Sequence, residues 1–223
     1  MLNTSEAIVK KPWGQEYSIY ENPSMAMWLL QINPNQKTSL HCHPKKKTGL
    51  IVLNDRVRIH LLEKSFELQA LSKIMIRNWM FHRIENLSST IPLFVVEVET
   101  PNEKGDLIRV RDDYGRKNKP FEGKEHWEAK SEKCFCIANK KSVFSGCFFE
   151  IKTVAEALEL QLIPRGPDII VVLEKAAFKT QDDQVLCDTG EVLTIKILKL
   201  LDSLFISQQD TKILHIYRDI IDD

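Results

Sequence analysis

Three histidines in the first half of the chain have the type and spacing of a metal site. His41 and His43 are two residues apart, just after the turn formed by residues 33–37. Residues two apart in a β-strand face the same side, so both imidazoles can reach one ion. His82 follows about forty residues later, beside another β-rich stretch. Neutral imidazoles suit zinc, iron, manganese, nickel or copper better than magnesium or calcium. The pattern therefore predicts a transition-metal site.

An ordinary structural role is the alternative for these residues. A His-x-His pair often occurs by chance as polar residues at a strand end, and the third histidine favours the metal site. His60 and His126 lie among polar neighbours and are expected at the surface.

The elements that must position these histidines are short β-strands. Turn sequences at residues 33–34, 54–55 and 101–102 separate β-rich segments, a spacing that favours an antiparallel sandwich or barrel over βαβ units. A barrel brings residues far apart in sequence to one interior. The expected strands are Met25–Ile32, Thr48–Leu53, Val57–Leu62, Lys73–Ile76 and Leu93–Val98.

The second half shows a faint repeat of the first. IVLNDRVRIH (51–60) resembles VVLEKAAFKT (171–180), and LSKIMI (71–76) resembles GEVLTI (190–195). We expect two domains, residues 1–116 and 117–223, with a polar connector at 116–130. A short helix is expected at Thr153–Leu160, and strands at Ile169–Leu173, Ala176–Lys179, Gly190–Ile195 and Lys212–Tyr217.

The repeat predicts no metal site in the second domain. Leu162, Ile163 and Pro164 would stand there near the place of His41 and His43, and the remaining histidine, His215, lies on the final apolar strand.

Composition restricts the function classes. The 31 basic residues balance the 31 acidic ones, which gives no sign of a nucleic-acid or membrane partner. The chain begins without the apolar core of a signal peptide, and no apolar run approaches the roughly 20 residues of a membrane span. We therefore expect a cytoplasmic protein whose five cysteines are free thiols.

Five motifs in order resemble the cupin domain of type II phosphomannose isomerases, a domain also found at the C-terminus of bifunctional mannose-1-phosphate guanylyltransferases. The likeness covers about residues 10–116. The motifs are KPWG (Lys11–Gly14), TSLHCH (Thr38–His43), FHRIEN (Phe81–Asn86), VVEVETP (Val95–Pro101) and DLIRVRDDYGR (Asp106–Arg116).

This resemblance implies an all-β jelly-roll barrel, here duplicated as a bicupin with a short connecting helix, and chemistry on a phosphorylated hexose. It places His41 at a glutamine of the family, and His43 and His82 at its two histidines. The glutamate of the family falls on Thr48. A carboxylate ligand would offset part of the charge of the ion, so its loss puts the isomerase activity in question.

Several further residues are candidates for the site. Glu97 and Glu99 share one face of a strand, where either can act as the base or supply the missing carboxylate, unless both face solvent. Arg109, Arg111 and Arg116 can hold a phosphate, or else pair with nearby aspartates; of these, Arg109 and Arg116 match the family. The lysines Lys45–Lys47 are either a solvent-exposed run or a positively charged segment that attracts an anionic substrate. In the second case Lys47 would bind the substrate.

These observations leave three functional hypotheses. The first is a metal-dependent aldose–ketose isomerase of the mannose-6-phosphate type, acting in nucleotide-sugar or surface-polysaccharide metabolism. The second is a three-histidine iron dioxygenase, and the third a sugar- or metal-binding cupin without turnover. The expected cofactor is a divalent transition metal, zinc first, then iron, manganese or nickel. A homodimer is a further expectation.

Overall fold

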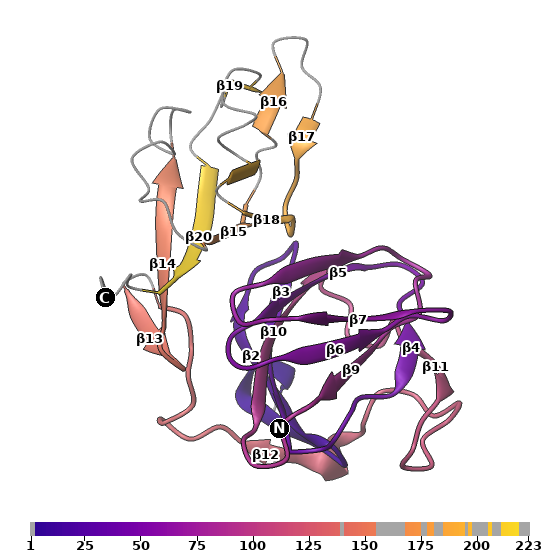
Figure 1. The fold of residues 1–223 in the computed structure, drawn as a ribbon. Helices are drawn as coiled ribbons and strands as arrows, with labels where there is room; N and C mark the ends of the chain where they lie inside the picture. Colours follow the sequence, from indigo (N-terminus) through magenta and orange to yellow (C-terminus); the bar gives the residue numbers. More distant parts are fainter. Residues whose placement is uncertain are drawn as a thin grey trace. The chain divides into compact units, whose positions relative to one another are not determined.

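The computed structural model describes residues 3–138, 141–154, 168–174, 178–180, 185–194, 196–197, 205–206 and 211–218. They form two compact units, Met1–Cys136 and Ile137–Asp223, built almost entirely of β-strands (Figure 1). No helix among the described residues is long and apolar enough to cross a membrane.

From residue 3 onward, the first unit contains twelve strands and two 3-10 turns, η1 (Thr4–Glu6) and η2 (Lys124–His126). The strands are β1 (Ala7–Lys11), β2 (Gly14–Glu21), β3 (Ala26–Ile32), β4 (Leu40–Cys42), β5 (Lys47–Val52), β6 (Val57–His60), β7 (Ser65–Leu68), β8 (Lys73–Ile76), β9 (Arg83–Asn86), β10 (Leu93–Thr100), β11 (Ile108–Arg111) and β12 (Trp127–Ala129). The five strands predicted for this half are confirmed as β3, β5, β6, β8 and β10, within two residues at each end.

The first unit extends beyond the boundary predicted at Arg116. Strand β12 pairs with β1, with Ala7 opposite Ala129, and this pairing draws the supposed connector into the domain. The compact unit therefore ends at Cys136.

Two antiparallel layers make up this unit as a jelly roll. One layer is a seven-stranded sheet in the order β12-β1-β2-β3-β10-β5-β8. The other combines the ladders β7-β6-β9 and β11-β4, which are linked by a bridge between His41 and His82. The predicted all-β jelly-roll class is thus confirmed.

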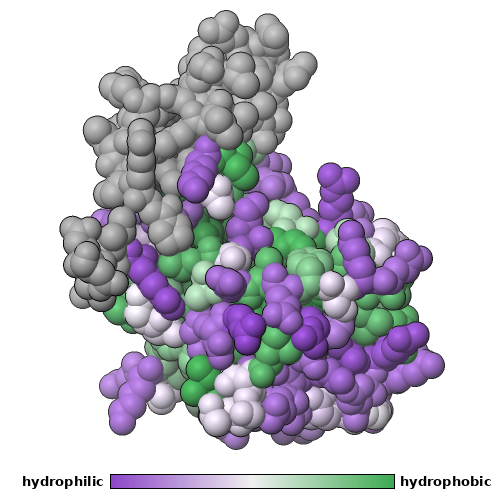
Figure 2. Space-filling view, in the orientation of Figure 1, coloured by the Kyte–Doolittle hydropathy of each residue, from purple (hydrophilic) through white to green (hydrophobic). Residues whose placement is uncertain are grey.

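The face drawn in Figure 2 carries mostly hydrophilic side chains with small apolar areas between them.

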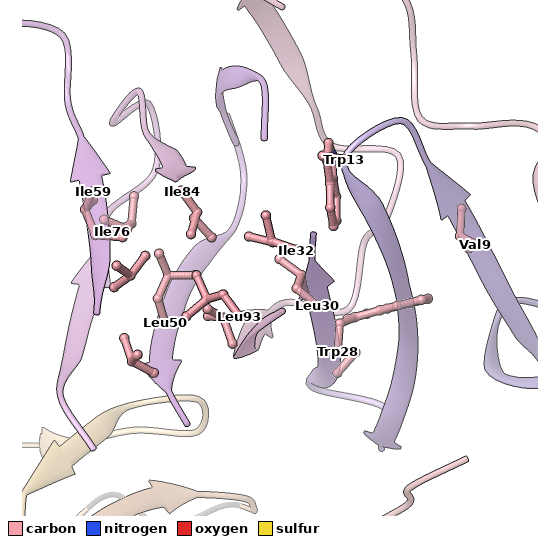
Figure 3. Packing of buried hydrophobic residues seen from close by; sticks show 14 residues of the cluster. Val9, Trp13, Trp28, Leu30, Ile32, Leu50, Ile59, Ile76, Ile84 and Leu93 are labelled. Atoms are coloured by element: carbon pink, nitrogen blue, oxygen red, sulfur yellow. The ribbon is translucent and has the colours of Figure 1, made fainter. Parts of the chain in front are cut away.

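The core between the layers comes from alternating residues. In β6, Val57 and Ile59 are buried while Arg58 and His60 are half-exposed, the period-2 pattern of a strand with one dry face. Leu30, Leu50 and Leu93 come from three neighbouring strands of one sheet and belong to one buried hydrophobic cluster (Figure 3). Burying each such side chain contributes about 1.5–3 kcal/mol.

The interior changes character along β10. Val95 belongs to the apolar core, whereas Glu97 and Glu99, two and four residues further along the same face, are 6% and 1% exposed. The alternative that both glutamates face solvent is wrong. This polar end of the interior is where the site lies.

The described residues of the second unit form a five-stranded sheet, β13-β14-β20-β15-β18, and a three-stranded sheet, β17-β16-β19. Its strands are β13 (Ser142–Phe144), β14 (Cys147–Val154), β15 (Ile169–Val172), β16 (Phe178–Thr180), β17 (Val185–Cys187), β18 (Val192–Thr194), β19 (Phe205–Ile206) and β20 (Thr211–Tyr217). The strands predicted in this half overlap β15, β16, β18 and β20.

The helix predicted at Thr153–Leu160 does not begin where expected, because Thr153 and Val154 continue strand β14. Residues 155–160 of that prediction, and Leu162–Pro164, lie outside the described residues.

Four strands of the second unit have the order of four strands of the first: β14-β20-β15-β18 against β3-β10-β5-β8, all antiparallel. The backbone contacts also correspond. The Leu71 N–H donates to the Val52 carbonyl at 2.8 Å, and the Gly190 N–H donates to the Val172 carbonyl at 2.8 Å. Leu71 and Gly190 both have a positive φ, 59° and 80°.

Candidate metal centre

The structure brings His41, His43 and His82 together. His41 lies in β4, His43 directly follows it, and His82 exchanges two backbone hydrogen bonds of 3.0 and 2.8 Å with His41. The ring centroids are 4.4 Å apart for His41–His82, 5.0 Å for His41–His43 and 5.4 Å for His43–His82. All three side chains are buried.

The hydrogen bonds of the three rings fix their tautomers. Each Nδ1 faces a backbone carbonyl: His41 with Ser39 at 2.9 Å, His43 with Asp106 at 2.5 Å, and His82 with Met80 at 3.1 Å. A carbonyl can only accept, so Nδ1 carries the proton and Nε2 keeps its lone pair. Among the described residues, Nε2 of His43 and of His82 is buried without a hydrogen-bond partner. Metal-ligating histidines have this arrangement.

Electrostatics keep the imidazoles neutral, as metal ligands must be. Burial, together with the neighbouring rings, holds the pKa of His41 well below its usual value. Burial and the charge of Lys46 lower the pKa of His43 to about 3. Burial lowers the pKa of His82 to about 4.

Glu97 adds a carboxylate to the cluster. Its oxygen and the ligand nitrogens of the three histidines all lie within 4.8 Å of one another. Thr48, where the resembled family has its glutamate, is fully buried on the adjacent strand β5, opposite Glu99. A carboxylate is therefore within reach although the expected position lacks one. Three imidazoles and a carboxylate suit a transition metal.

The two glutamates of β10 have different electrostatic surroundings. Burial, with a contribution from the charge of Glu99, raises the pKa of Glu97 to about 7. Burial would also raise the pKa of Glu99, but the ammonium groups of Lys104 and Lys46 outweigh it and lower that pKa to about 2. Their Nζ atoms lie 3.3 and 2.7 Å from Glu99 Oε1.

The cluster opens on a cavity of about 50 Å³, enough for an ion and a few water molecules. Arg109 and Arg116 line this cavity, but both guanidinium groups already contact Glu122, at 3.0 and 2.6 Å. The Lys47 side chain is not among the lining groups, whereas Lys46 is.

Sequence reasoning missed several charged residues of this interior. Lys46 was expected in a solvated run, but it is 1% exposed and forms a salt bridge with Glu99. Glu122 lay in the supposed connector, yet it is buried and contacts Lys11 as well as the two arginines. Lys104 lies 3.8 Å from the centroid of the Trp28 ring. Charge patterns alone gave no signal for these positions, because isolated charges usually indicate solvent exposure.

Comparison with known families matches residues 2–112 to the family described as "Mannose-6-phosphate isomerase C-terminal". A curated relative, the alginate biosynthesis protein AlgA of Pseudomonas aeruginosa, is 27% identical over 114 residues. The match covers 50% of this chain and 24% of that protein, so the chain spans about a quarter of the length of this relative.

Solved structures similar to this chain are distant in sequence. KdgF from Halomonas sp. is 12% identical with a TM-score of 0.39, covering 42% of this chain and 84% of that one. A conserved protein with a double-stranded β-helix domain from Klebsiella pneumoniae is 17% identical with a TM-score of 0.40, covering 50% and 90%. The capsular polysaccharide assembling protein CapF from Staphylococcus aureus is 15% identical with a TM-score of 0.42, covering 47% and 34%.

Proposed function

We propose that the first unit, a cupin domain resembling the C-terminal domain of mannose-6-phosphate isomerases, is a metal-dependent aldose–ketose isomerase of a phosphorylated sugar. The observation that carries the proposal is the buried cluster of three neutral imidazoles and Glu97 on an interior cavity. Zinc is the first candidate for the metal, followed by iron, manganese and nickel.

His41, His43 and His82 would hold the ion through Nε2. A divalent ion held there would supply Lewis acidity to polarise the sugar carbonyl. The protein must then move a proton between two adjacent carbons. We assign this step to Glu97, because its carboxylate lines the cavity beside the three histidines and a carboxylate there can take up and return a proton. Glu99, held by two lysines, is the weaker base.

The substrate phosphate is proposed to bind where positive charge lines the cavity. Arg109 and Arg116 offer guanidinium groups that match phosphate oxygens, and Lys46 takes the place proposed earlier for Lys47. Ligand pockets usually measure about 300–1,000 Å³, much more than this cavity. We propose that the cavity widens when substrate binds, as the arginines exchange their contacts with Glu122 for contacts with the phosphate.

The test is exchange of the C2 proton in deuterated water, followed by NMR over a panel of hexose and pentose phosphates with the metal-loaded protein. We expect exchange with at least one sugar phosphate and its loss in His43→Ala together with the metal. A fully loaded protein that exchanges no proton on any of them contradicts isomerase activity and leaves a binding role without turnover.

The variant Glu97→Gln separates two roles of this residue. If Glu97 acts as the base, its replacement leaves the metal content nearly unchanged, while the rate of C2-proton exchange falls at least about 100-fold. As the fourth ligand, its replacement lowers metal content as well. Lys45→Gln, at an exposed lysine outside the cavity, is the matched control and should change neither quantity.

An iron dioxygenase is the second candidate, favoured by three neutral histidines with no carboxylate at Thr48. Glu97 within 4.8 Å of the histidine ligand atoms weakens that argument. Purification without added metal separates the candidates: iron together with thiol-dependent oxygen uptake supports the dioxygenase, and zinc without uptake supports the isomerase.

We further propose that the second unit is a cupin-like repeat of the first. In the shared strand register, Glu97 pairs with Leu50 in one unit and His215 with Ile170 in the other, so His215 takes the place of Glu97. By the same register Asp168 takes the place of Thr48, and its carboxylate lies 3.5 Å from His215 Nε2. One metal ion per chain, lost in His43→Ala, is expected; a second ion that survives this variant contradicts a metal-free second unit.

A further inference from the structure

A second, separate cavity lies in the first unit between the β6–β7 hairpin and strand β11. Its volume is about 310 Å³, and none of the residues that line it lines the metal cavity. Leu40, His60, Leu61, Leu62, Glu63, Lys64, Ser65, Arg83 and Arg111 line it. We name it the hairpin groove.

Two cations of the hairpin groove are unpaired. Among the described residues, neither the Lys64 ammonium nor the Arg111 guanidinium has an ion-pair or hydrogen-bond partner, and both side chains are exposed. Arg83 is half-paired: its Nη2 lies 3.3 Å from Asp113, while its Nε is buried and has no partner. Glu63 is the one acidic residue lining the groove. The groove therefore carries an excess of positive charge with donors left to make bonds.

A β-bulge directs Arg111 into the groove. Strand β11 pairs Arg109 with His41 but Arg111 with Leu40, so the register shifts between the two arginines. Leu40 and His41 are neighbours in β4 and point to opposite faces. Because Arg111 pairs with Leu40, its side chain points away from the barrel interior, whereas Arg109, which pairs with His41, points into it. Arg109 is 4% exposed, and Leu40 lines the groove together with Arg111.

A hydrogen-bonded pair of polar side chains, His60 and Ser65, forms part of the groove wall. The Nε2 atom of His60 lies 2.7 Å from Glu85, which fixes the ring, and its Nδ1 lies 2.8 Å from Ser65 Oγ. The Ser65 hydroxyl is thus held at the cavity wall beside Lys64. Leu61 and Leu62 add apolar surface, and Leu62 is 63% exposed.

The geometry points to a binding site for a small phosphorylated molecule, whose phosphate or diphosphate group is held by Lys64, Arg83 and Arg111. Guanidinium groups bind such oxyanions through paired hydrogen bonds. The apolar wall of Leu61 and Leu62 would contact the organic part. This site is distinct from the metal centre and does not depend on the proposed function.

The test is titration of the full-length, metal-free protein, labelled with 15N, with inorganic pyrophosphate, inorganic phosphate and sulfate at constant ionic strength. We expect saturable shifts of the backbone amides of residues 60–65, 83 and 111, with pyrophosphate binding most tightly. The double variant Lys64→Gln/Arg111→Gln should weaken binding at least about tenfold, because two charge-assisted contacts are lost.

Arg56→Gln is the matched control: Arg56 is an exposed arginine of the same unit that pairs with Glu67 at 3.7 Å and does not line the groove. It should bind pyrophosphate like the unmodified protein. The inference is overturned if the double variant binds as tightly as the unmodified protein, if the control weakens binding equally, or if the shifts are confined to the metal cavity. All of these substitutions change exposed side chains, so the spectra also report directly that the fold is retained.

Discussion

Glu122 offers the sharpest test of how the interior of the first unit is stabilised. Its carboxylate contacts Lys11, Arg109 and Arg116, and its side chain is 5% exposed. Although burial raises its pKa, the charge and hydrogen bond of Lys11, followed by the charge of Arg109, lower it to about 2. The folded state therefore holds this carboxylate ionised far into the acid range.

The size of the effect follows from linkage. A pKa lowered from 4.5 to about 2 corresponds to stability on the order of 3 kcal/mol. Because the folded pKa is the lower one, this stability is fully present above about pH 4.5 and is lost as the pH falls toward 2. Glu122→Gln removes the charge at every pH and leaves three buried cations with less compensation. We expect it to lower the free energy of unfolding by about 3 kcal/mol at pH 7.

Urea unfolding followed by tryptophan fluorescence measures this quantity in the first unit, because all four tryptophans lie within residues 1–136. Glu128→Gln is the matched control, since Glu128 is 62% exposed in its pair with Lys10. It should change stability by less than about 0.5 kcal/mol. The ion network would be refuted as a stabilising element if Glu122→Gln behaved like the control, or if it left the loss of stability below pH 4.5 unchanged.

Three further outcomes are expected. Trp28→Ala should lower the free energy of unfolding of the first unit by about 3–5 kcal/mol, because Trp28 is 1% exposed and its ring lies beneath the ammonium of Lys104. An unchanged midpoint of urea unfolding would contradict this prediction. Zinc at 100 times its Kd should raise the free energy of unfolding of the first unit by about 2.7 kcal/mol, and a similar gain in His43→Ala would place the ion elsewhere. Burial and the charge of Lys152 lower the pKa of His215 to about 4, below its unfolded value of about 6.5. The second unit should therefore lose stability as the pH falls from 6.5 toward 4. Amide hydrogen exchange in β20 measures this loss, and the variant His215→Asn should abolish the pH dependence.

The strands were predictable from sequence because their patterns are strong. Two segments rich in β-branched residues and bounded by turns form strands as predicted, Val57–His60 and Leu93–Val98. The histidine cluster was predictable for a related reason. A period of two placed His41 and His43 on one face, and the barrel brought His82 opposite them.

Other features required the tertiary structure. Lys46 lies between two lysines that differ from it only in position, and its burial is decided by a partner 53 residues away, Glu99. Arg109 and Arg111 were expected to bind the same phosphate, but they line different cavities. Their separation depends on a β-bulge that cannot be recognised from the sequence. Long-range pairing and register, not local propensity, determine such positions.

The histidine cluster has a carboxylate, Glu97, although Thr48, the position expected from the family resemblance, has none. Thr48 on β5 and Glu97 on β10 lie on adjacent antiparallel strands, and both point into the same end of the interior. The carboxylate of Glu97 reaches the ligand nitrogens of the histidines, so the absence of a carboxylate at Thr48 is compatible with the proposed chemistry. In the proposed repeat, the same two places hold Asp168 and His215, in contact at 3.5 Å. Strand register fixes which positions face the interior, and the side chain at each of these positions decides which donor group stands there.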